Sequence, residues 1–202
     1  SDPVMRREHL VRFPLGAVHL STAAVLIVGL AADNYLPLYV QTVRGASEQA
    51  AAFTLVFLTV GWTLGAIVFS RLPRRWPESR ATVAGASTML PALVLVTVVF
   101  AVDGPLWALF VGFSAMGVSI GLVSTSGITW MQRDAVESEM GRVNAAHQFV
   151  RTVAITVAVA LGGAVLLGTV EARTGAVESV RSLLAGDAAV VDADTVAAIG
   201  DG

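Results

Sequence analysis

Asp33 is the acidic side chain whose place in the sequence most strongly suggests chemistry. It lies within an apolar stretch, about six residues or roughly 8–9 Å outward of the middle if the stretch is helical. A carboxylate in hydrocarbon costs about 2.5–3.5 kcal/mol on insertion scales and is tolerated chiefly beside a cavity or a partner. We therefore expect Asp33 to exchange protons or to attract cations. The alternative is that the helix breaks near Pro37 and that Asp33 reaches water at the outer interface.

Polar and aromatic residues surround this carboxylate. Asn34 and Tyr35 follow it directly, and Tyr39 and Gln41 lie one to two turns further along. Together with Asp33, we take Asn34 and Tyr35 as candidates for substrate binding or proton coupling, because an aromatic and amide-lined wall suits a lipophilic or cationic molecule. Tyrosines near a membrane surface also form ordinary aromatic belts, and this alternative is stronger for Tyr39 than for Tyr35.

Arg151 is the basic counterpart, about eight residues into another apolar stretch. Asn144, Gln148 and Arg151 are spaced so that they share one helical face. An arginine inside a membrane must pair with an acid, a carbonyl or an anion, so Gln148 and Arg151 are further candidates for substrate binding or coupling. The alternative is an arginine that extends to the nearer membrane surface. His147 beside this face, and His19, are able to titrate near neutral pH, although a structural role is the commoner one.

These residues lie in a strongly apolar chain. Its 202 residues are 55% hydrophobic and 14% charged, and the mean hydropathy is +0.73, as expected for a membrane protein. Because a spanning helix needs about 20 apolar residues, the sequence predicts an all-α integral membrane fold with five such helices. Their approximate limits are 14–41, 51–70, 82–102, 106–130 and 144–168.

Composition also excludes several classes of function. The net charge of −2 does not favour nucleic-acid binding, and the absence of cysteine removes disulfides, thiolate metal sites and cysteine nucleophiles. We expect no metal and no cofactor. The first apolar run lacks a small-residue cleavage site, so it does not resemble a removable signal peptide.

The arginines predict an orientation, because cytoplasmic loops are enriched in basic residues. One set of loops holds Arg6, Arg7, Arg12, Arg71, Arg74, Arg75, Arg80, Arg133 and Arg142, whereas the other holds Arg44, Arg173 and Arg181. We therefore expect a cytoplasmic lead-in at 1–13, a five-helix bundle at 14–168, and an acidic extracytoplasmic connector at 169–202 that leads toward a missing final helix.

Two glycine pairs predict close helix packing. Gly61 and Gly65 are four residues apart in the second stretch, as are Gly117 and Gly121 in the fourth. Small residues at this spacing let membrane helices approach closely.

Three stretches together resemble the carboxy-terminal half of a major facilitator superfamily transporter, most closely the fourteen-helix drug:proton antiporter branch. They are Asn34 to Gln41, Gly61 to Arg75 and Gly141 to Arg151. The second resembles the family's short basic loop, and Arg71, Arg74 and Arg75 are its conformational residues by that resemblance. Ser70 and Pro73 stand where the family has an acid and a glycine, so the acid's charge relay to a neighbouring helix is not expected from Ser70.

The resemblance implies a multi-pass protein of the plasma membrane that exchanges small lipophilic or cationic compounds for protons. Its partners would be the lipid bilayer, the substrate, protons and the missing amino-terminal half of the transporter. The alternatives are an uptake carrier of the same fold and a non-transporting truncated protein. An enzyme is not expected, since Ser126-Gly127 with His147 on the next span only approaches the motif of an intramembrane serine protease.

Overall fold

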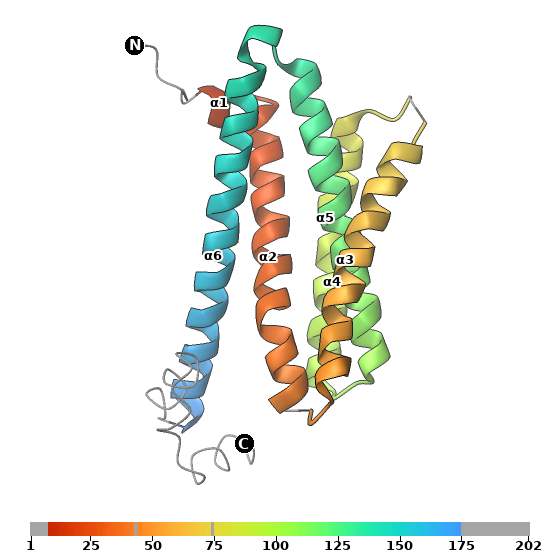
Figure 1. Ribbon diagram of the computed structural model, residues 1–202, viewed down its shortest axis with the longest axis vertical. Helices are drawn as coiled ribbons and strands as arrows, with labels where there is room; N and C mark the ends of the chain where they lie inside the picture. The colour runs from red at the N-terminus through yellow and green to blue at the C-terminus, as the bar shows by residue number, and fades with distance from the viewer. Residues whose placement is uncertain (1–7, 43, 74, 175–202) are drawn as a thin grey trace.

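The computed structural model describes residues 8–42, 44–73 and 75–174, and within these ranges the chain is helical without a strand (Figure 1). A short helix α1 (Glu8–Val11) precedes five long ones. These are α2 (Leu15–Thr42), α3 (Glu48–Arg71), α4 (Glu78–Ala101), α5 (Leu106–Asp134) and α6 (Met140–Thr174), with a 3-10 turn η1 (Glu137–Glu139) before the last. All five long helices are apolar enough to cross a membrane. The predicted all-α membrane fold is therefore confirmed.

The loops predicted from turn residues separate these helices. Ser47 caps the start of α3, where its hydroxyl oxygen accepts a hydrogen bond from the Ala50 amide at 3.3 Å. Pro77 and Pro105 directly precede α4 and α5, where a missing N–H removes no helical hydrogen bond. Pro37 lies inside α2, which continues to Thr42, so the helix does not break beside Asp33.

The helices differ from the sequence-based limits by up to about six residues at their ends, since α4 begins at Glu78, α5 ends at Asp134 and α6 begins at Met140. The region predicted as a plain lead-in contains α1, and α6 continues to Thr174, beyond the predicted limit at 168. Most of the predicted connector, from 175 to 202, lies outside the described residues, as do residues 1–7 and Arg74.

The five long helices form two groups that meet along α2 and α5 (Figure 1). In one group α5 packs against both α3 and α4, and in the other α2 packs along α6. α5 is the most enclosed of the five, and its Phe113, Met116 and Ile120 are fully buried. Val25 and Leu26 of α2 join the same apolar cluster. The core of the bundle thus lies around α5.

Direct backbone contact joins α3 to α5. A Cβ atom built on Gly61 would overlap the Ser114 carbonyl oxygen, and one on Gly117 would overlap the carbonyl oxygen of Leu58. Gly65 and Gly121 meet in the same contact, one turn along each helix. The two glycine pairs therefore face each other, and the helices touch where no side chain separates them.

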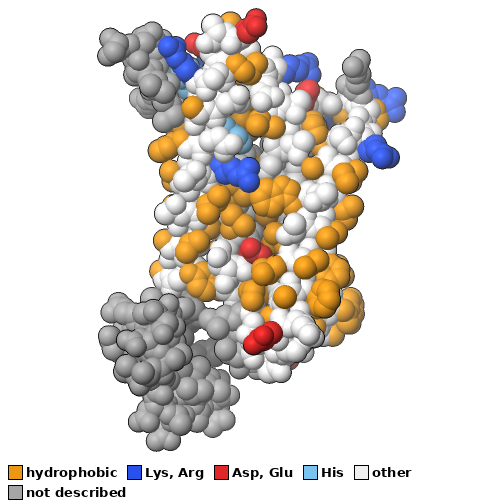
Figure 2. Space-filling model, viewed as in Figure 1, with side chains coloured by type: hydrophobic (Ala, Val, Ile, Leu, Met, Phe, Trp, Pro, Cys, Tyr) orange, Lys and Arg blue, Asp and Glu red, His pale blue; other side chains and the backbone are white. Residues whose placement is uncertain are grey.

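Basic side chains gather at the end of the bundle where α1 lies (Figure 2). The loop between α3 and α4 and the turn between α5 and α6 reach this same end (Figure 1). At the opposite end, Arg44 donates a hydrogen bond to the Gly104 carbonyl and lies 3.7 Å from the Asp103 carboxylate. This contact ties the loop after α2 to the loop after α4.

The glycine contact predicts opposite effects of one substitution at two sites. Gly117→Ala should lower the free energy of unfolding by about 1–3 kcal/mol, because the added methyl group forces α3 and α5 apart. Gly141→Ala should leave it unchanged or raise it by up to about 1 kcal/mol, since nothing lies within 4 Å of a Cβ there and alanine favours helix. Thermal unfolding in detergent measures both. Equal effects would contradict the contact.

Candidate functional site

Tyr35 reaches from α2 to α6. Its hydroxyl donates a hydrogen bond to the Val159 carbonyl oxygen at 2.9 Å. Its ring lies against Gly162, where a Cβ atom would overlap it, and a Cβ on Gly163 would lie 2.8 Å from the hydroxyl oxygen. The adjacent glycines are the feature of the sequence that leaves room for this ring, and the contact was not predicted. Tyr35 therefore holds α2 against α6, and its hydroxyl is already engaged.

Asp33 is half-buried within α2, one position before the exposed Asn34. The Asn34 side-chain amide donates to the Leu30 carbonyl of its own helix at 2.7 Å. Within the described part of the chain, no basic side chain forms an ion pair with Asp33. The span therefore carries a carboxylate whose charge no neighbouring cation balances.

Arg151 lies over the indole ring of Trp62, with its Cζ atom 5.5 Å from the ring centroid. This cation–π contact joins α6 to α3 and places the guanidinium against an aromatic face. Gln148, one turn earlier on α6, is exposed, and its backbone carbonyl accepts a hydrogen bond from Thr152 at 2.9 Å. Trp62 lies within the stretch from Gly61 to Arg75, but its contact with Arg151 was not predicted from the sequence.

Asp33 and Arg151 do not meet. α2 and α6 run in the same direction (Figure 1), and Tyr35 faces Val159 while His19 stacks on His147. By this register, Asp33 lies roughly 9–15 Å further along the bundle than Arg151. The two charged groups occupy separate levels.

The hydroxyl groups of α5 serve packing. Ser119 donates to the Gly85 carbonyl at 2.6 Å, and Ser126 lies 2.8 Å from the Thr82 hydroxyl of α4. Ser126 also donates to the Leu122 carbonyl at 2.6 Å. These bonds satisfy polar groups within the apolar core and hold α4 against α5.

An ion pair bridges α4 and α5 beside the basic loop. Arg133 donates to both carboxylate oxygens of Glu78, at 2.8 and 2.9 Å. Ser70 donates only to the Ile67 carbonyl, and Arg71 and Arg75 are exposed. The acid that connects this loop to a neighbouring helix is thus Glu78, eight residues after the expected position. Sequence reasoning missed it because its partner is far away in the chain.

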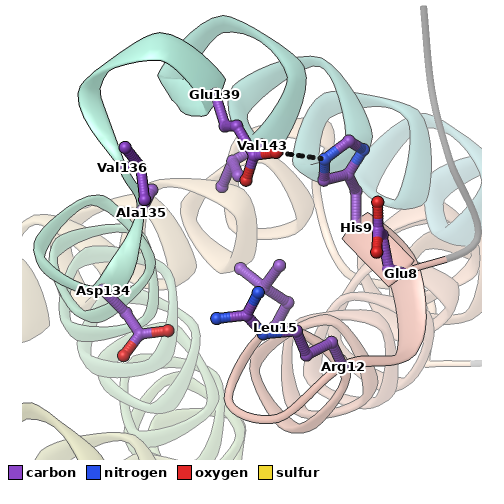
Figure 3. A pocket seen from close by; sticks show the side chains of 9 residues that line it. All are labelled: Glu8, His9, Arg12, Leu15, Asp134, Ala135, Val136, Glu139 and Val143. Atoms are coloured by element: carbon purple, nitrogen blue, oxygen red, sulfur yellow. Dashed lines mark ion pairs between the residues drawn. The ribbon is translucent and has the colours of Figure 1, made fainter. Parts of the chain in front are cut away.

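A small pocket opens at the same end of the bundle (Figure 3). Its lining mixes acidic, basic and apolar side chains from α1, α2, the end of α5, the turn before α6 and the first turn of α6. The residues are Glu8, His9, Arg12, Leu15, Asp134, Ala135, Val136, Glu139 and Val143. His9 lies 3.9 Å from the Glu139 carboxylate. The pocket therefore marks where α1 is fastened to the start of α6. No three potential metal ligands gather anywhere in the described ranges.

The contact between Arg151 and Trp62 predicts a coupled loss of stability. Arg151→Gln and Trp62→Leu should each lower the free energy of unfolding by about 0.5–2 kcal/mol, and the double variant should lose less than their sum. Trp107→Leu is the matched control, because Trp107 is exposed on α5. Additive losses in thermal unfolding would show that the two residues do not interact.

The ion pair between Glu78 and Arg133 predicts rescue by charge exchange. Glu78→Arg alone should lower stability by up to about 1 kcal/mol, since Arg133 is largely exposed, and the added Arg133→Glu change should restore most of it. High salt should shrink the difference. A double variant no more stable than Glu78→Arg would exclude a direct pair.

Comparison with known proteins gives one match. A family model described as Major Facilitator Superfamily matches residues 2–159, which include α1 to α5 and α6 as far as Val159. Neither the curated proteins nor the solved structures gave a match to the chain.

Proposed function

Because this chain belongs to the major facilitator superfamily, a family of membrane transporters, we propose that it works in the export of small lipophilic or cationic compounds in exchange for protons. The match over residues 2–159 supports the family, and the five apolar helices support a membrane protein. Direction, substrate and coupling ion are our proposal, as is the plasma membrane as its location.

Asp33 is the observation that carries the proposal. Its carboxylate lies within the membrane-spanning α2, half-buried and without an ion-pair partner among the described residues. Such a group is stable in a membrane when it binds a proton or faces a cationic ligand. Proton binding and cation binding at one carboxylate exclude each other, and this competition is the simplest basis for exchange.

The residues near Asp33 and Arg151 suggest how a substrate is held. Gln148 is exposed on α6, so its side-chain amide is available to a ligand. The exposed Asn34 offers its side-chain oxygen, because its amide nitrogen already donates to the Leu30 carbonyl. Tyr35 offers its ring, because its hydroxyl is bound to Val159. The face of Trp62 is already covered by Arg151, so a cationic substrate would have to displace that guanidinium. We propose that flat apolar cations bind between the levels of Arg151 and Asp33.

Transport by this mechanism needs a second half. Alternating access in this family rocks two related halves about a site near the membrane midplane. We propose that this chain is most of the carboxy-terminal half, with its amino terminus in the cytoplasm, and that an amino-terminal half completes the site. The concentration of basic side chains at the end that holds α1 supports this orientation (Figure 2).

Helix packing supports one further missing element. In a half built from two inverted repeats of three helices, α2 and α5 occupy equivalent positions. α5 packs closely against two helices, α3 and α4, whereas α2 packs closely along one, α6. Leu20 on α2 remains 74% exposed. We propose that a sixth helix packs along α2 as α4 packs along α5. The basic loop with Arg71, Arg74 and Arg75 would then move with the ion pair of Glu78 and Arg133 as the halves rock.

The proposal predicts that Asp33→Asn abolishes proton-driven efflux. Vesicles containing the full-length protein should export a fluorescent lipophilic cation when a proton gradient is imposed, and the variant should lose at least tenfold of that rate. Glu48→Gln, an exposed acid at the start of α3, is the matched control and should retain the rate. Efflux and coupling that persist in Asp33→Asn would refute the role of Asp33. Movement of the substrate in the same direction as the protons would instead identify an uptake carrier.

A further inference from the structure

His19 and His147 form a buried pair that the proposed transport chemistry does not use. Their rings stack between α2 and α6, with centroids 5.8 Å apart and planes inclined by 23°. The two residues are 4% and 3% exposed, so water reaches neither ring freely. Histidine is uncommon inside a membrane, where ionisable groups mark functional sites by default.

Three polar atoms around this pair lack a hydrogen-bond partner. They are Nε2 of His19, Nδ1 of His147 and the hydroxyl oxygen of Thr22, which lies one turn from His19 and is itself 1% exposed. Buried polar groups are normally bonded, so an unbonded set of this kind needs an explanation. Each imidazole therefore has one buried ring nitrogen without a hydrogen-bond partner.

One hydrogen bond decides which nitrogen of His19 accepts a proton. Nδ1 lies 3.2 Å from the Leu10 carbonyl oxygen of α1, and a carbonyl accepts only, so Nδ1 must carry the hydrogen. In the neutral ring, Nε2 then holds a free lone pair. His19 therefore presents a basic nitrogen to the buried space.

The surrounding charges oppose a proton in the closed arrangement. Arg151 is one turn beyond His147 on α6 and acts on that ring as a fixed positive charge. From α1, His9 approaches Glu139 of η1, so this acid lies beside His9. From α5, Gly127 packs near Val18 and Thr22 and offers no charge. A second cation here would be buried beside a first one, which is costly.

We propose that His19 and His147 form a proton-binding site, and that binding of one proton separates α2 from α6 at the end covered by α1. The proton passes from water to a ring nitrogen, and no other bond is made or broken. Because the open arrangement admits water to the imidazolium, it binds the proton more tightly, so falling pH shifts the population toward it. The use of this step in transport rests on the proposed proton exchange, but the step itself does not.

The helix separation is measurable directly, since the chain contains no cysteine. Cysteines introduced at the exposed Leu20 and Ala145 in the full-length protein carry spin labels on α2 and α6, beside the pair. Electron-spin distance measurements in lipid vesicles between pH 8 and pH 5 should show a population at longer distance that grows as pH falls. Its midpoint should lie below the ordinary histidine value of about 6.5, because the closed arrangement opposes protonation.

His19→Asn with His147→Gln should remove this pH dependence. Asparagine keeps a donor for the Leu10 carbonyl, and neither amide titrates in this range. His9→Gln is the matched control, a buried histidine of α1 outside the pair, and should retain the pH dependence. A wild-type distance that does not change with pH would overturn the proposal, as would a change that persists in the double variant. If the double variant fails to fold, the wild-type and single-variant curves decide.

Efflux assayed on the same vesicles separates this inference from the proposed function. A pH-dependent distance that the double variant loses, in a protein without proton-driven efflux, would support the histidine site and refute proton exchange. Proton-driven efflux together with a distance that does not depend on the two histidines would support proton exchange and refute the histidine site.

Discussion

The backbone contact between α3 and α5 is the constraint on which most of this bundle depends. Lipid tails are as apolar as the helix surfaces, so no hydrophobic effect drives the helices together, and close packing must supply the attraction. The facing glycines allow that packing, and α5 then offers its remaining sides to α4 and α2. Trp62 lies between Gly61 and Gly65, so the same contact fixes the ring that Arg151 covers.

α6 is attached by different means. It is the least enclosed of the five spans, and its described contacts with the bundle include several polar or aromatic ones. Tyr35 bonds to the Val159 carbonyl, His19 stacks on His147, and Arg151 lies over Trp62. Such contacts are few and directional, so a proton or a ligand can alter them individually. α6, which carries the candidate residues Gln148 and Arg151, is therefore the helix best suited to move.

Particular residues show how far sequence reasoning reached. The limits of the apolar runs and the turn residues between them located all five helices, because helical length and backbone satisfaction in a membrane leave little choice. Asp33 and Arg151 were selected by the cost of a charge in hydrocarbon, and that role stays a prediction. Trp62 as the partner of Arg151, and Glu78 as the partner of Arg133, were missed, because each contact joins residues distant in the chain.

The sequence by itself determined that this is an all-α membrane protein, which segments form its five long helices, and which residues incur a desolvation cost. These properties depend on composition and local spacing, which the chain carries at each point. Only the tertiary structure decided that the histidines of α2 and α6 stack, that Tyr35 is engaged by α6, and that Asp33 and Arg151 lie at separate levels. The register between two helices fixes those facts, and it arises from side-chain fit across their contact, which no single segment encodes.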